Sequence, residues 1–167
     1  MSREIFFSKK GNPDWNYNVT IPFGLYSFVL FYASQNNSNG GELLFKGSIS
    51  KWKYRHIHNL PKNGFSVTDY DAYYEPNELQ PLIDYLNNQL IPALTNENEA
   101  DISELYGGLD NYYNLFNNST NYVGEFGLFE SELYGYYVSQ VIDAVVELRD
   151  FFQRIKDNSF QYEISID

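Results

Sequence analysis

The sequence predicts an α+β fold, in which an antiparallel sheet of about four to five strands packs against two main helices. Three observations lead to this prediction. Residues 1–62 are rich in aromatic and branched residues between turn signals, as strands are. Two later segments, 76–94 and 131–157, carry apolar residues at helical spacing. The final segment, 159–167, alternates apolar and polar residues, as a half-buried terminal strand does.

The N-terminal part of the predicted sheet is a meander of antiparallel strands. The segment Gln35–Gly41 contains the Asn and Gly residues that tolerate the positive φ angles of hairpin turns. Leu60–Gly64 supplies a second turn. The strands are expected at Glu4–Ser8, Leu25–Ala33, Glu42–Ser50 and Lys51–His58.

The first predicted helix spans residues 76–94. Asn77 is expected to cap its start, and Pro92 to kink or end its last turn. Residues 95–130 form an irregular acidic region with one short helix expected near Leu109–Asn117, and long irregular segments are often functional. The buried stripe of the first helix comprises Leu79, Leu82, Ile83, Leu86, Leu90 and Leu94.

The second predicted helix spans residues 131–157, with Ser131 as its cap. A terminal strand follows it, which places the whole chain, 1–167, in one globular domain. The buried stripe of this helix comprises Tyr134, Tyr137, Val138, Val141, Val145, Leu148, Phe152 and Ile155.

Composition narrows the class of protein. The chain of 167 residues has no cysteine, so disulfides, zinc–thiolate sites and thiol catalysis are excluded. Its net charge of −11, from 22 acids and 11 bases, disfavours nucleic acid or an anionic membrane as a partner. The N-terminal residues 1–10 lack the apolar stretch of a secretory signal, and no apolar run approaches the length of about 20 residues that a membrane span needs, so we expect a cytoplasmic protein.

Motifs that carry chemistry are scarce. Nucleotide-binding, esterase-type, zinc-protease and EF-hand motifs do not occur. His56 and His58 would share one face of the predicted strand, but no third metal ligand is indicated. The basic run Lys51–His56 is expected to pair with the protein's own carboxylates rather than with nucleic acid. We therefore expect a protein that is not an enzyme and holds neither a cofactor nor a metal.

The most distinctive feature is the layout of charge. Residues 63–148 contain 15 carboxylates and neither Lys nor Arg, whereas residues 46–62 contain five bases and no acid. Tyrosines, which are common at protein interfaces, lie among these acids. We expect this acidic region to bind a basic partner protein. The predicted contact residues are Asp69, Tyr70, Asp71, Tyr73, Tyr74, Glu75, Glu97, Glu99, Asp101, Glu104, Tyr106, Asp110, Tyr112, Tyr113 and Tyr122.

A small, cysteine-free, acidic and aromatic-rich α+β domain resembles, by type, the inhibitors that neutralise toxins, namely bacterial immunity proteins and phage-encoded inhibitors of host defence. The resemblance implies stoichiometric occlusion of a basic cleft in a toxin or nucleic-acid-processing enzyme, by a monomer or homodimer. Two alternatives stay open. One is a divalent-metal-dependent hydrolase that uses Asp69, Asp71 and Glu75. The other is a structural or adaptor protein whose acidic surface serves only solvation.

Overall fold

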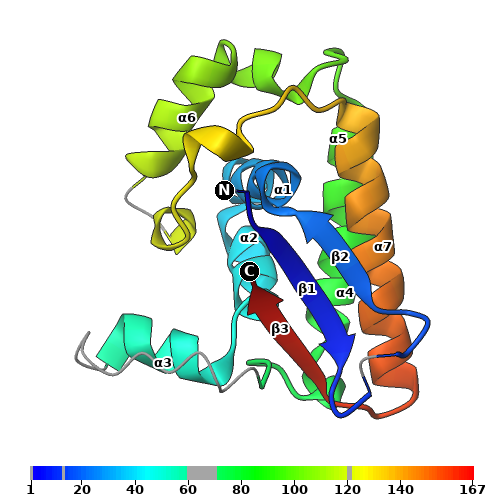
Figure 1. Ribbon diagram of the computed structural model, residues 1–167. Helices are drawn as coiled ribbons and strands as arrows, with labels where there is room; N and C mark the ends of the chain where they lie inside the picture. Colours follow the sequence, from blue (N-terminus) through cyan, green and yellow to red (C-terminus); the bar gives the residue numbers. More distant parts are fainter. Residues whose placement is uncertain (1, 13, 60–70, 120–121) are drawn as a thin grey trace.

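A three-stranded antiparallel sheet lies on one side of the computed structural model, which describes residues 2–12, 14–59, 71–119 and 122–167 (Figure 1). The strand order is β2-β1-β3, where β1 is Glu4–Lys9, β2 is Val19–Pro22 and β3 is Tyr162–Ile166. The mixed α and β class is thus confirmed. The expectation of four to five strands is not matched within the described residues.

The inner face of the sheet packs on two helices, α1 (Phe23–Asn36) and α7 (Val138–Asp157). The ring of Phe7 in β1 lies 5.8 Å from that of Tyr26 in α1 and 5.9 Å from that of Phe152 in α7. The strands predicted at both ends of the chain are confirmed, because β1 and β3 alternate buried and less buried residues on this core.

The predicted strand Leu25–Ala33 is wrong, because this segment belongs to α1. Every residue from Tyr26 to Ala33 is buried, so α1 runs through the core instead of along its surface. A helix that is buried on all sides carries no amphipathic period. An apolar run of this kind therefore does not distinguish a buried helix from a buried strand.

The predicted strands at 42–50 and 51–58 are also wrong, since α2 (Ser38–Gly47) and α3 (Lys51–Asn59) occupy these residues. The Asn-rich segment is a helix start rather than a hairpin, because the side chain of Asn37 accepts hydrogen bonds from the amides of Asn39 and Gly40. Gly40 also permits a close approach, since a Cβ there would lie 2.1 Å from the ring of Tyr85. The strand face expected for His56 and His58 does not exist, and their side chains lie outside the described residues.

The helix predicted at 76–94 is present as a 3-10 turn and, after Leu79, an unbroken helical segment from Gln80 to Thr95. A 3-10 turn (η1, Pro76–Glu78) precedes α4 (Gln80–Tyr85), a π-helical turn (η2, Leu86–Leu90) and α5 (Ile91–Thr95). All six apolar residues of its predicted stripe are buried. Pro92 does not end the helix, which continues to Thr95. In the π turn that precedes Pro92, Ile91 N–H donates to Leu86 O. Asn77 is not the cap; Glu78 instead accepts from the Glu75 amide.

The second predicted helix begins at Val138 rather than at Ser131. Before it, the chain is held beside the segment around Asp101, because Val138 N–H donates to Ala100 O and Ile102 N–H donates to Tyr136 O. Tyr134 and Tyr137 are therefore exposed, and their predicted place on the buried stripe is wrong. The helix α6 (Leu109–Asn117) is confirmed. The rest of the acidic region is held by 3-10 turns η3 (Ile102–Tyr106), η4 (Tyr122–Glu125) and η5 (Glu130–Glu132).

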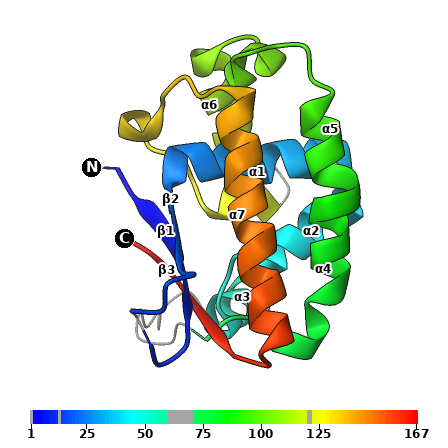
Figure 2. The ribbon, with the colours of Figure 1, turned by 90° about the vertical axis from the view of Figure 1, so that its right-hand side faces the viewer.

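The helices form layers behind the sheet (Figure 2). Seen edge-on, the sheet is followed by α1 and α7 and then by α4 and α5. The connection from α5 to α6 lies at one end of the molecule, and α3 lies at the opposite end (Figures 1 and 2). Within the described residues, no helix has both the length and the apolar character needed to cross a membrane.

Candidate partner-binding surface

The structure divides the predicted contact residues between two ends of the molecule. Residues 71–75 lie near α3, whereas residues 97–113 lie at the end formed by the α5–α6 connection and α6 (Figures 1 and 2). Asp69 and Tyr70 lie outside the described residues, as does the side chain of Tyr122. One continuous surface that contains all the predicted residues is therefore not formed by the described part of the chain.

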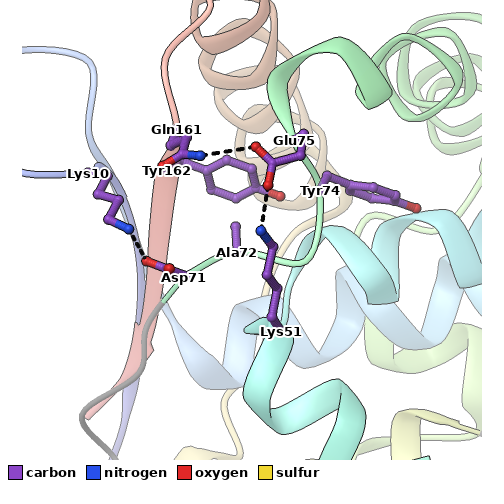
Figure 3. A pocket seen from close by; sticks show the side chains of 8 residues that line it. All are labelled: Lys10, Lys51, Asp71, Ala72, Tyr74, Glu75, Gln161 and Tyr162. Atoms are coloured by element: carbon purple, nitrogen blue, oxygen red, sulfur yellow. Dashed lines mark hydrogen bonds and ion pairs between the residues drawn. The ribbon is translucent and has the colours of Figure 1, made fainter.

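At the α3 end, the acids are paired with bases of the same chain (Figure 3). Lys10 Nζ lies 2.6 Å from Asp71 Oδ1, and Lys51 Nζ lies 2.5 Å from Glu75 Oε1. Gln161 Nε2 also donates to Glu75 Oε2 at 3.1 Å. The hydrogen bonds from Lys51 and Gln161 lower the pKa of Glu75. The expected pairing of the basic run with the protein's own carboxylates is thus confirmed for Lys51.

The same contacts bear on the metal-site alternative. The crevice between these residues has a volume of about 10 Å³, which suits one water molecule. The ammonium groups of Lys10 and Lys51 occupy one oxygen each of Asp71 and Glu75, so a divalent cation would have to displace them. In the described ranges, no group of three His, Asp or Glu side chains is placed to hold a metal ion.

Two of the tyrosines predicted as contact residues face inward. Tyr112 is fully buried, with its ring stacked at 4.0 Å on that of Phe28. Tyr74 is buried as well, and its hydroxyl donates to Leu43 O at 3.1 Å. Their assignment as surface contacts is therefore wrong, because aromatic rings of this size complete the core between the helices. Tyr73, Tyr106 and Tyr113 are half-buried.

At the opposite end lie five carboxylates without a basic partner among the described residues. We call Glu97, Glu99, Asp101, Glu104 and Asp110 the acidic end. Asp101 accepts hydrogen bonds from the amide and hydroxyl of Ser103, and Glu97 accepts one from the Tyr32 hydroxyl. Glu99, Glu104 and Asp110 are exposed. None of the five forms an ion pair within the part of the chain that the structure describes.

Two exposed tyrosines that the sequence reasoning missed lie beside this acidic end. Tyr134 and Tyr137 have exposed fractions of 56% and 62%. Tyr137 forms an isolated β-bridge with Asp101, which brings the two segments together. Gly135, which disfavours a helix, is the sequence signal that these residues precede the helix instead of belonging to it.

The acidic end thus combines exposed aromatic rings with carboxylates that form no ion pair in the described part of the chain, which is a combination suited to contact with a basic protein surface. Comparison with known proteins adds no assignment to this arrangement. No family model matches the sequence, and no curated protein and no solved structure shows a significant similarity to it.

Proposed function

We propose that this protein is a non-enzymatic inhibitor that binds a basic surface of another protein through its acidic end. The observation that carries the proposal is the absence of ion pairs at Glu97, Glu99, Asp101, Glu104 and Asp110 within the described residues. The fields of neighbouring unpaired carboxylates add, so they attract a cationic partner and speed its association. Tyr134 and Tyr137 supply rigid apolar contact area beside them.

The partner that suits this surface is a protein with a basic cleft, such as a cytoplasmic toxin or a nucleic-acid-processing enzyme. Clefts that bind phosphate backbones are lined by Lys and Arg, and a set of carboxylates occupies them by the same charge complementarity. In this role the protein acts stoichiometrically, as an immunity protein or a phage-encoded inhibitor of a defence protein does. The surface at Asp71 and Glu75 is less suited to the role, because both acids are already paired.

The experiment compares two triple variants with the same change of charge. The test variant carries Glu99→Lys, Glu104→Lys and Asp110→Lys, which are exposed acids of the acidic end. The control carries Asp84→Lys, Glu147→Lys and Asp157→Lys, which are exposed acids elsewhere on the molecule. After a partner has been isolated with the wild-type protein, its dissociation constant is measured for each variant by calorimetry at low and moderate salt.

We expect the test variant to bind at least about 100-fold more weakly, and the control to stay within about threefold of wild type. Equal effects of the two variants would show that only net charge matters, which favours the purely solvating surface. Calorimetry with Mg²⁺, Mn²⁺ and Ca²⁺ addresses the hydrolase alternative. A stoichiometric site of micromolar affinity that disappears in Asp71→Asn would contradict the non-enzymatic proposal.

A further inference from the structure

A hollow of about 390 Å³ lies where the C-terminal part of α1 meets the acidic end. Its walls come from three residues of α1 and three residues of the segment between α5 and α6. Glu97 belongs to this wall and contributes a carboxylate, while the rest of the lining is uncharged. The lining residues are Tyr32, Gln35, Asn36, Glu97, Leu105 and Tyr106.

Two polar groups in this wall have unused hydrogen-bonding capacity. The carboxylate of Glu97 accepts one hydrogen bond, from the Tyr32 hydroxyl to Oε1 at 2.6 Å, and forms no ion pair within the described residues. The hydroxyl of Tyr106 is buried and has no hydrogen-bond partner in the described part of the chain. A buried hydroxyl without a partner costs free energy, which a bound ligand recovers when it supplies one.

The shape of the wall is set by aromatic packing. The ring of Tyr106 is held at 5.0 Å from that of Phe31 and at 5.4 Å from that of Tyr112. Tyr112 is itself part of the core, so the position of the Tyr106 ring is supported from behind. A wall that is preformed in this way binds a small group without a large ordering cost.

We propose that this hollow receives a guanidinium group, namely an arginine side chain of the basic partner. The inference rests on the proposed function and names the first contact of the partner with the acidic end. A guanidinium is planar and weakly hydrated, stacks on aromatic rings and pairs with carboxylates in a fork geometry. Glu97 supplies the charge, the half-buried ring of Tyr106 supplies the aromatic wall, and the Tyr32 hydroxyl holds the Glu97 carboxylate in place.

Other ligand classes fit the same wall less well. An anion would meet the carboxylate of Glu97 and the acidic residues that follow it in the chain. A divalent cation prefers six or more oxygen ligands, several of them carboxylates, whereas the lining of this hollow contains a single carboxylate, that of Glu97. A neutral ligand would leave the Glu97 carboxylate without a counter-charge. A monovalent, flat organic cation can pair with the Glu97 carboxylate and stack on the Tyr106 ring.

The first test uses n-butylguanidinium as the probe and n-butylurea as its uncharged counterpart. Each is titrated into the wild-type protein at low salt, and backbone amide shifts are followed by NMR. We expect a saturable, millimolar response to n-butylguanidinium at residues 97 and 106, and no saturable response to n-butylurea. A response centred on residues 71–75, or the same response to both compounds, would overturn the inference.

The matched variants are Glu97→Gln and Glu99→Gln. In Glu97→Gln, the amide oxygen of the introduced side chain still accepts from Tyr32, so the fold is preserved while the charge is removed. We expect Glu97→Gln to weaken the probe about tenfold, and Glu99→Gln to change it less than twofold. A third variant, Tyr106→Phe, is expected to keep or raise the Tm while weakening the probe about threefold. Equal affinities for Glu97→Gln and Glu99→Gln would overturn the assignment.

The isolated partner then separates this inference from the proposed function. If the triple variant of the acidic end loses the partner and Glu97→Gln weakens it no more than Glu99→Gln does, the guanidinium site is wrong while the acidic interface stands. If the triple variant keeps the partner, the proposed function itself fails. If the triple variant and Glu97→Gln both lose affinity for the partner, the proposed function and the guanidinium site are both supported. We expect Glu97→Gln to weaken the partner at least about tenfold.

Discussion

Arg3 Nη2 lies 2.8 Å from Glu132 Oε1, and this ion pair joins residues that are 129 positions apart. Arg3 Nε donates to the second carboxylate oxygen at 3.0 Å, so the contact is bidentate. The remaining guanidinium hydrogen bonds go to the carbonyl oxygens of Phe126 and Gly127. The pair thus ties the segment before α7 to the first strand of the sheet.

The first prediction removes the charge of this pair. Glu132→Gln leaves Arg3 without its counter-charge in a site where the Glu132 side chain is fully buried, so we expect a loss of about 3 kcal/mol in the free energy of unfolding. Burial of Glu132 opposes its ionisation, but hydrogen bonds from Arg3 and from two amides outweigh this effect and lower the pKa. The folded state therefore binds fewer protons than the unfolded state near this pKa.

It follows that the contribution of Glu132 is present above its ordinary pKa of 4.5 and is lost as the pH falls through the lowered value. Urea unfolding at pH 7, 5 and 3 measures this. The gap between wild type and Glu132→Gln is expected to narrow at pH 3. Glu130→Gln, at an exposed position two residues away, serves as the control and should change little. A constant gap at all three pH values would contradict the prediction.

The second prediction concerns a lysine whose charge is disfavoured. Lys53 Nζ lies 4.5 Å from the ring centre of Phe126, and burial, together with the charge of Arg3, lowers the pKa of Lys53 to about 8. Since its ordinary value is 10.5, the unfolded state binds more protons between pH 8 and pH 10.5. Stability should therefore rise with pH across this window.

Lys53→Met removes the buried charge, so we expect it to increase the free energy of unfolding at pH 7 by roughly 1–3 kcal/mol. The gain should shrink towards pH 10.5. Lys51→Met is the matched control and is expected to lower the free energy of unfolding at pH 7. Lys51 pairs with Glu75, and that hydrogen bond raises the pKa of Lys51. Destabilisation by both substitutions at pH 7 would count against the assigned environment of Lys53.

The third prediction separates a core tyrosine from a surface tyrosine. The Tyr112 hydroxyl shares a hydrogen bond of 2.7 Å with Ser27, and its ring is fully buried. We expect Tyr112→Phe to cost about 1 kcal/mol and Tyr112→Ala about 3–5 kcal/mol. Tyr137→Ala, at an exposed ring, should stay within about 0.5 kcal/mol. Thermal unfolding of the three variants measures these differences. An unchanged free energy of unfolding in Tyr112→Ala would contradict the buried position of this ring.

The fourth prediction tests the approach of α1 to the segment before α7. A Cβ atom on Gly24 would lie 2.1 Å from the backbone oxygen of Glu132, which leaves no room for a methyl group. We expect Gly24→Ala to lower the free energy of unfolding by about 3 kcal/mol, although alanine favours helices in general. Asn114→Ala on the exposed face of α6 is the control. Equal Tm values for Gly24→Ala and wild type would show that the two segments lie further apart.

Periodicity predicted the parts of the fold that lie half in the core. The stripe from Leu79 to Leu94 and the alternation from Tyr162 to Ile166 were interpreted correctly, since each has one buried face. The segment Leu25–Ala33 was misread because a helix buried on all sides has no polar face to report its period. The segment after Gln35 was misread because Asn and Gly serve helix starts as well as hairpins.

Part of the candidate site could likewise be predicted from the sequence, and part could not. Charge is a property of composition, so the acids of residues 97–110 could be identified from the sequence alone. The direction of each tyrosine depends on long-range packing, which no local pattern records; Tyr112 therefore turned inward and Tyr137 outward against expectation. The ion pair of Lys10 with Asp71 joins segments that are distant in the sequence, so it could not be predicted from a local pattern either.

The position of β1 between β2 and β3 has a consequence for the order of folding. Ile5 pairs with Ile166 and Lys9 with Tyr162, so the central strand acquires its second neighbour only after residues 162–166 have been synthesised. Until then, Phe7 has β2 beside it, and a two-stranded ribbon is marginal in water. Contacts this distant in sequence slow folding. During synthesis, the helices that lie between β2 and β3 in the sequence are therefore free to pack before β3 pairs with β1.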